Sequence, residues 1–356
     1  MFDFRLLDQP TIILLLSNVT VLAVLFVVGR FLRKRSESEI DKDVVRAFSR
    51  NMLSWIIMCV VLALALMVNE LFTVIFFWFV SFWAQREFIT LTPTRPGDHR
   101  TLFWVILIFP ILQYVLVGMA WYELYSILIP VYGVLFVAAR IAFANDQEGY
   151  LERIAKIQFG LLICVYALSH APALLTWEPW QKWDSEAGGL RPWTGAKGGL
   201  LLYLVVIVQF SDMVHFVVDR TFGKQVIAPR VHETKSWEGL IAAAFASAVV
   251  GVLIQLFLPV TPFQVIGSGV MALIISVMAS SGSMTMWAIK RDRGIARQGT
   301  LVSNRGVLDQ IASICFAAPI FFHVTRLFLG RPTTVPTEEA NEPLQTYLWQ
   351  ITYWIC

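Results

Sequence analysis

Residues 199–218 read GLLLYLVVIVQFSDMVHFVV, an apolar run in which polar side chains begin at Gln209 and Asp212. About 20 apolar residues cover the hydrocarbon thickness of a bilayer, so this run predicts a membrane-spanning helix. An ionisable side chain within such a helix is costly and usually functional. The stretch therefore predicts both a membrane fold and a functional site at Asp212.

The composition of the whole chain supports this prediction. Of its 356 residues, 57% are hydrophobic and 15% charged, whereas soluble domains carry roughly 25% charged residues. The four cysteines show no spacing typical of a disulfide framework or a zinc site, so we expect them to act as apolar residues. The fold class that follows is all-α, a polytopic integral membrane helical bundle.

Ten segments are long and apolar enough to cross a membrane. They are 11–32, 52–68, 70–91, 101–119, 122–142, 158–177, 199–219, 239–259, 263–288 and 310–329. We divide the chain into N-terminal helices (1–157), a catalytic membrane domain (158–330) and an interfacial tail (331–356). The Trp-rich segment 176–193 is expected to be an external loop at the interface.

Lysine and arginine gather in alternate connections between the spans, which predicts that these connections are cytoplasmic. Both polar segments of the C-terminal half, Ser211–Gly239 and Ile289–Gln310, fall on this side. We therefore expect a multi-pass membrane protein with a site that faces the cytoplasm.

The segment Ile289–Gln310 combines phosphate-binding donors with glycines that permit close backbone approach. Its basic residues include Lys290, Arg291, Arg297 and Arg305, and Asp309 closes it. Each arginine alone is equally well explained by the positive-inside rule. A carboxylate at the start of a membrane helix can instead hold a divalent ion while basic residues hold phosphates.

The segment Ser211–Gly239 has the same character. Asp212 could be a polar side chain that reaches for the membrane surface, but the cost of an aspartate at this depth favours burial in the bundle or a role as a metal ligand. Lys235 and Glu238 flank Trp237, which is either an interfacial anchor or a residue that stacks on a nucleobase.

These two segments resemble the motifs of the phosphatidate cytidylyltransferase (CDP-diacylglycerol synthase) family, in its longer bacterial branch. The first block is matched by Ser211-Asp212, Phe222-Gly223-Lys224, Ala228-Pro229-Arg230-Val231 and Lys235-Ser236-Trp237-Glu238-Gly239. The second is matched by Lys290-Arg291, Gly294-Ile295, Gly299, Gly306 and Leu308-Asp309. The resemblance covers about 199–329 and is weaker upstream, where it includes WFVSFWAQREF (78–88).

The resemblance implies transfer of CMP from CTP to phosphatidic acid or a related lipid phosphate. It implies that Asp212, Asp309, Lys290 and Arg291 are catalytic and that both aspartates bind Mg²⁺. The substrate-binding residues that it implies, together with our reading of the basic segments, are Gly223, Lys224, Lys235, Trp237, Glu238, Ser283, Arg297 and Arg305. The expected partners are CTP, the anionic lipid and the bilayer, with no nucleic acid; a homodimer stays open.

The chain departs from the family pattern at acidic positions. Ser283 stands where the family has an acidic residue before Lys290-Arg291, and Arg297 stands where it has an aspartate. The glycine-rich turn that follows is replaced by Asn304-Arg305-Gly306. Fewer carboxylates and more arginines weaken divalent-ion binding. The sequence therefore leaves two functions open, an active enzyme and a non-catalytic relative that binds an anionic lipid or nucleotide. The sequence shows no repeated halves of the kind that would favour a transporter.

Overall fold

The structure is a computed structural model, and its spans follow from the apolar runs of the sequence. It describes residues 6–34, 42–92, 94–144, 146, 148–184, 189–294 and 306–329. Within these ranges, ten helical segments are long and apolar enough to cross a membrane. The ten predicted spans are thus confirmed, and the protein is a polytopic helical membrane protein.

Seven spans are single helices. These are α1 (Gln9–Lys34), α2 (Lys42–Val68), α3 (Glu70–Leu91), α10 (Lys197–Thr221), α11 (Trp237–Phe257), α12 (Val265–Asp292) and α13 (Val307–Leu329). Asn69 separates α2 from α3, and its side chain accepts a hydrogen bond from the backbone of Phe72. This cap allows one helix to start directly after another ends.

The other three spans each join two α-helical pieces through a π-helical turn. They are α4 (His99–Phe103), η3 (Trp104–Ile108) and α5 (Phe109–Gly118); α6 (Tyr122–Ile127), η4 (Leu128–Gly133) and α7 (Val134–Ala142); and α8 (Tyr150–Leu161), η5 (Leu162–Ala167) and α9 (Leu168–Thr176). A short helix η2 (Pro96–Asp98) precedes the first of them. Pro110, Pro130 and Pro172 lie in or just after these turns. Proline removes a helical hydrogen bond and crowds the preceding turn, and a wider turn accommodates both effects.

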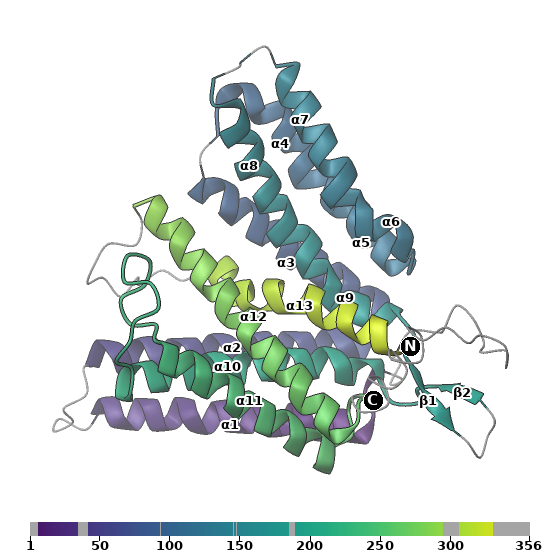
Figure 1. Cartoon of the computed structure of the whole chain (residues 1–356), viewed down its shortest axis with the longest axis vertical. Coiled ribbons are helices and arrows are strands. Elements are labelled where there is room, and N and C mark those ends of the chain that lie inside the picture. Colours follow the sequence, from purple (N-terminus) through teal and green to yellow (C-terminus); the bar gives the residue numbers. More distant parts are fainter. Residues whose placement is uncertain are drawn as a thin grey trace, which may run out of the picture.

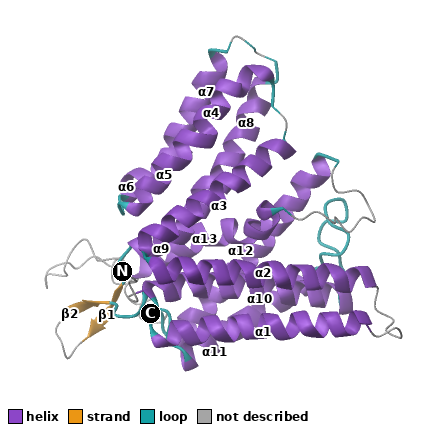
Figure 2. Ribbon diagram, turned by 180° about the vertical axis from the view of Figure 1, so that it is seen from behind, coloured by secondary structure: helices purple, strands orange, loops and turns teal. Residues whose placement is uncertain are grey.

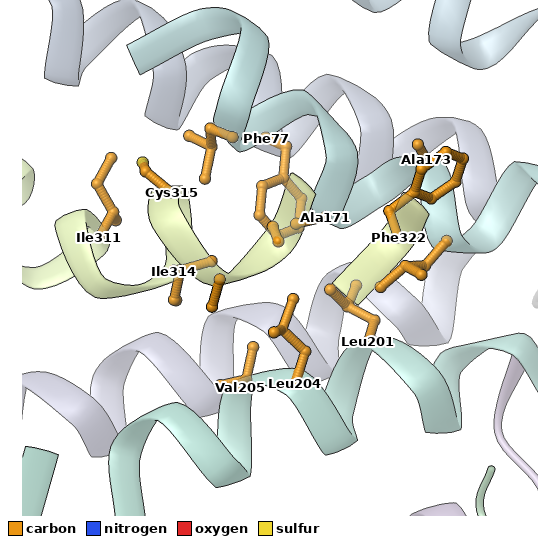
Figure 3. Close-up of a cluster of buried hydrophobic side chains, with 14 of the residues drawn as sticks. Phe77, Ala171, Ala173, Leu201, Leu204, Val205, Ile311, Ile314, Cys315 and Phe322 are labelled. Carbon is orange, nitrogen blue, oxygen red and sulfur yellow. The ribbon is translucent and has the colours of Figure 1, made fainter. Parts of the chain in front are cut away.

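Helix α10 is enclosed over most of its length, since every residue from Gly198 to Gln209 is buried. It packs against α1, α9, α11, α12 and α13. Figure 1 shows α1, α2, α10 and α11 side by side, with α12 running obliquely across them, α13 above them and the α4–α8 group leaning away. In Figure 3, the α13 side chains Ile314 and Phe322 lie over α10 at Leu204 and Leu201. This apolar contact fixes α13 against α10, and both helices carry candidate site residues.

One element departs from the expected all-helical fold. Strands β1 (Trp180–Asp184) and β2 (Gly189–Pro192) form an antiparallel hairpin in the Trp-rich segment, with Trp180 opposite Pro192. Both views place this hairpin and the loop between α10 and α11 at opposite ends of the bundle (Figures 1 and 2). The alternation of aromatic and polar residues in this segment is compatible with a strand. Tryptophans that favour the membrane interface can also lie in a strand.

The three cysteines within the described residues are buried, as apolar residues would be, although Cys59 also hydrogen-bonds with Gln209 and Asn18. Cys59, Cys164 and Cys315 are all free thiols. Cys356 and the tail 331–356 lie outside the described residues.

Candidate functional site

The two polar segments meet because α10 and α12 run parallel in a fixed register. Three buried side-chain pairs link the two helices, and the members of each pair are 65 residues apart in the chain: Tyr203 with Ser268, Ser211 with Ser276, and His215 with Ser280. A constant separation is what two parallel helices of equal pitch produce. The C-terminal ends of α10 and α12 therefore lie at the same end of the bundle, where α11 and α13 begin.

Asp212 reaches α13. The hydroxyl of Ser313 donates a 2.9 Å hydrogen bond to Asp212 Oδ2. Ser313 follows Asp309 by four residues on α13 (Val307–Leu329), and residues with this spacing lie on one helix face with Cβ atoms about 5–6 Å apart. Asp212 and Asp309 thus converge on one face of α13, although 97 positions separate them in the chain.

Asp309 is paired with Lys290 of α12, whose ammonium group contacts its carboxylate. Both side chains are largely buried, with 7% and 15% of their surfaces exposed. The two helices approach closely nearby, because a Cβ at Gly282 would overlap the backbone carbonyl of Ala312. Ser283, the next residue, is half-buried. The buried ion pair of Lys290 and Asp309 therefore lies about one turn of α13 from Ser313, the partner of Asp212.

The loop between α10 and α11 is held by Asp219. Its Oδ1 atom accepts hydrogen bonds from the backbone amide of Ser236 at 2.9 Å and from the Ser236 hydroxyl at 2.7 Å. Two glycines leave room for this arrangement. A Cβ at Gly239 would overlap the Asp219 carboxylate, and one at Gly223 would lie 2.5 Å from the Asp219 carbonyl oxygen. Gly223 is predicted from the sequence to bind substrate. In the structure, its missing side chain leaves room for the backbone of Asp219.

Glu238 closes the same loop from the other side. Its carboxylate accepts hydrogen bonds of 3.2–3.3 Å from the backbone amides of Lys224 and Gln225. Its contacts are thus with the protein's own backbone. Trp237 has 49% of its surface exposed. Lys224 is exposed as well.

The tip of the loop contacts α12. The rings of His232 and Trp287 meet edge to face with centroids 4.4 Å apart, and Glu233 lies 3.6 Å from Arg291. His232 Nδ1 accepts a 3.1 Å hydrogen bond from the backbone amide of Lys235. Lys235 is also buried, with 8% of its surface exposed. These contacts bring Lys235 and Arg291 to the end of the bundle that holds Lys290.

The structure therefore brings together Asp212, Asp309, Lys290, Arg291 and Lys235. Arg297 and Arg305 lie outside the described residues. Four residues near this group were not predicted from the sequence as site residues. Ser313 contacts Asp212, Glu87 contacts the amide of Leu308 next to Asp309, and His215 and Ser280 form a pair between α10 and α12. Ser313 could have been found from its four-residue spacing to Asp309, whereas the others depend on contacts between helices.

The carboxylate pair fits a metal ion that arrives with phosphates. Among the residues that the structure describes, no group of three or more His, Cys, Asp or Glu side chains is placed to hold a metal. Mg²⁺ is commonly bound through one or two carboxylates together with substrate phosphates and water. Asp212 and Asp309, with the hydroxyl of Ser313 hydrogen-bonded to Asp212, would supply that number of protein ligands.

The ten spans within the described residues, with carboxylates and cations gathered at one end of the bundle, define a polytopic membrane protein. The sequence profile of the cytidylyltransferase family matches residues 49–328. The chain belongs to the cytidylyltransferase family, and the resemblance seen in its motifs is confirmed.

Relatives of this family are similar to different lengths of the chain. The Escherichia coli K12 protein named uncharacterized protein YnbB is 31% identical over 257 residues, 71% of this chain and 79% of that protein. A Haemophilus influenzae phosphatidate cytidylyltransferase is 33% identical over 129 residues, 34% of this chain and 44% of that protein. Phosphatidate cytidylyltransferase 4, chloroplastic, of Arabidopsis thaliana is 27% identical over 200 residues, 52% of this chain and 49% of that protein. The chain spans less than half the length of the two relatives named for this activity.

Proposed function

We propose that the protein transfers CMP from CTP to phosphatidic acid, or to a related lipid phosphate, and releases pyrophosphate. A phosphate oxygen of the lipid forms a bond to the α-phosphorus of CTP, and the bond from that phosphorus to the bridging oxygen of the β-phosphate breaks. The electron pair leaves with pyrophosphate, so no oxidant or reductant is needed. The product is CDP-diacylglycerol. Protein groups assist such a transfer chiefly by position and charge.

The observation that carries this proposal is the convergence of Asp212 and Asp309 on one face of α13, beside Lys290. Asp212 and Asp309 would hold Mg²⁺, which neutralises phosphate charge when bound. Lys290, Arg291 and Lys235 would hold phosphate oxygens. Lys290 and Arg291 each contact a carboxylate, of Asp309 and Glu233 respectively. Phosphate oxygens would therefore compete with these carboxylates for the cations.

The placement of basic residues supports a site on the cytoplasmic face of an inner membrane. The ends of α10 and α12 and the loop between α10 and α11 carry Arg220, Lys224, Arg230, Lys235, Lys290, Arg291 and Arg293. Short connections rich in lysine and arginine stay on the cytoplasmic side. A lipid substrate would then enter from the inner leaflet. A homodimer, and the division of the chain near residue 157, stay predictions.

A second candidate is a relative that binds CTP or an anionic lipid without turnover. It is favoured by Ser283 and Arg297 at positions that are acidic in the family, and by the contact of Lys290 with Asp309. A bound ammonium group neutralises the charge that would attract a metal ion.

One assay separates the two functions. Purified protein in detergent is incubated with labelled CTP, phosphatidic acid and MgCl₂, and the lipid extract is analysed for CDP-diacylglycerol. Formation of labelled lipid that requires both phosphatidic acid and Mg²⁺ supports the enzyme. Calorimetric binding of CTP or of phosphatidic acid with no labelled lipid supports the second candidate. Absence of turnover and of binding of either ligand contradicts both.

A further inference from the structure

Glu87 connects the N-terminal helices to the start of α13. It lies in the last turns of α3 (Glu70–Leu91), and its Oε2 atom accepts a 3.1 Å hydrogen bond from the backbone amide of Leu308. The first amides of a helix have no partner within the helix, and a carboxylate there also interacts favourably with the helix dipole. Glu87 thus supplies an acceptor to α13 from a position 221 residues away in the chain.

Gly306 is the residue that permits this contact. A Cβ at this position would overlap the Glu87 carboxylate. Gly306 is also what remains of a glycine-rich turn at which the chain departs from its family's motif. The retained glycine is therefore explained by the close approach of a side chain from α3, without invoking substrate.

Helix α3 is held firmly enough to act as a fixed support. On another face of the helix, the Ser81 hydroxyl donates a 2.6 Å hydrogen bond to the carbonyl of Cys164, and Gln85 Nε2 donates a 3.0 Å bond to the carbonyl of Val105. Both side chains are buried. Phe88 packs so closely on α8 that a Cβ at Gly160 would lie 2.6 Å from its ring. Such contacts fix the rotation of α3 about its axis, and with it the place of Glu87.

The residue that follows Leu308 is Asp309. A displacement of the Leu308 backbone would move Asp309 relative to Lys290 and Asp212. Misplacement of a reacting group by about 1 Å can reduce a rate about 10²-fold.

We infer that Glu87 is a positioning residue of the nucleotidyl-transfer site, which fixes the first turn of α13 and hence Asp309. This inference rests on the proposed function. It makes α3, which lies in the N-terminal helices (1–157), a part of the catalytic unit.

The activity test compares two substitutions of Glu87 in the full chain. Glu87→Gln keeps an oxygen that accepts the Leu308 amide, so kcat for CDP-lipid formation should stay within about 3-fold of wild type. Glu87→Ala removes the acceptor and should lower kcat by about 10- to 100-fold. It should also raise the Mg²⁺ concentration that gives half the maximal rate. The exposed Glu152→Ala on α8 is the matched control. Wild-type kcat in Glu87→Ala, or an equal loss in Glu87→Gln, would overturn the positioning role.

A second measurement tests the contact without activity. Gly306→Ala should lower the melting temperature of the protein in detergent, because its methyl group meets Glu87. In the Glu87→Ala background the same change should have little further effect, since the overlap is gone. Equal losses in both backgrounds would show that Glu87 does not contact Gly306. A wild-type protein with no turnover would overturn the proposed function and the catalytic part of this inference, and the melting-temperature cycle would still decide the contact.

Discussion

The hydroxyl of Ser313 lies 2.9 Å from a carboxylate oxygen of Asp212, and this hydrogen bond brings α10 to the face of α13 that carries Asp309. An aspartate in a membrane helix is tolerated when it finds a polar partner in the bundle interior. The partner here lies one helical turn from a second aspartate. The same contact therefore stabilises the bundle and assembles the two carboxylates of the proposed site.

Asp219 is predicted to hold the loop that carries Lys235. Asp219→Ala leaves the amide and the hydroxyl of Ser236 without their acceptor, and the Asp219 side chain is only 6% exposed. We expect a loss of about 2 kcal/mol in stability, seen as a lower melting temperature in detergent, and faster proteolysis within 223–236. Asp292→Ala is the control, since that side chain is 68% exposed. Unchanged proteolysis in Asp219→Ala would show that other contacts hold the loop.

Gly239 is predicted to tolerate no side chain. The methyl group of Gly239→Ala would overlap the Asp219 carboxylate and lie 2.7 Å from the ring of His215. Overpacking of this kind typically costs about 1–3 kcal/mol. Gly97→Ala is the matched control, because the nearest atoms to its Cβ would be 3.9 Å away. Similar melting temperatures for the two variants would contradict the close packing of α10 and α11.

Arg153 is predicted to be essential for the stability of the N-terminal helices. Its Nε atom donates to both carboxylate oxygens of Asp98 at 3.1 and 3.0 Å, and Asp98 is fully buried. Arg153→Ala leaves that charge unpaired, which costs about 3 kcal/mol or more. The exposed Arg100→Ala should have little effect on the melting temperature. Arg153→Met combined with Asp98→Leu should recover part of the loss, and a double variant less stable than Arg153→Ala would argue against an unpaired charge as the cause.

Restoring the family's acidic residues tests the effect of the chain's departures. Ser283→Asp with Arg297→Asp adds carboxylates and removes a positive charge, so Mg²⁺ binding should strengthen by Coulomb attraction. We expect the Mg²⁺ concentration for half-maximal activity to fall by about 10-fold, with a higher rate of CDP-lipid formation. The conservative Ser283→Asn with Arg297→Gln is the control for changes of shape. Equal responses from the two double variants would mean that charge at these positions does not limit the reaction.

The sequence predicts the spans well because the bilayer imposes a minimum length on each apolar run. The Asp212 and Asp309 segments could be assigned to one membrane face because lysine and arginine gather in alternate connections between the spans. Asp219 and Glu238 could not be assigned their roles, because their hydrogen bonds depend on the conformation of the loop between them.

Contacts between residues far apart in the sequence could not be predicted from local patterns either. Glu87 appears in its segment as an ordinary polar residue near a helix end, and only the packing of α3 on α13 brings it to Leu308. The sequence predicts an interfacial loop where the structure has the hairpin of β1 and β2. Its tryptophans are equally typical of membrane interfaces and of strands. Local patterns identify elements and charged clusters, whereas the partners of each side chain are set by tertiary packing.

The role of Asp212 and Asp309 is tested most directly by measuring Mg²⁺-dependent formation of CDP-diacylglycerol. The wild-type, Asp212→Asn and Asp309→Asn proteins are compared at equal folded concentration. We predict activity in the wild type and a loss of at least about 10²-fold in each variant, because each removes one of the two carboxylates that meet on α13. Wild-type rates in both variants would contradict the central claim that these aspartates form the site.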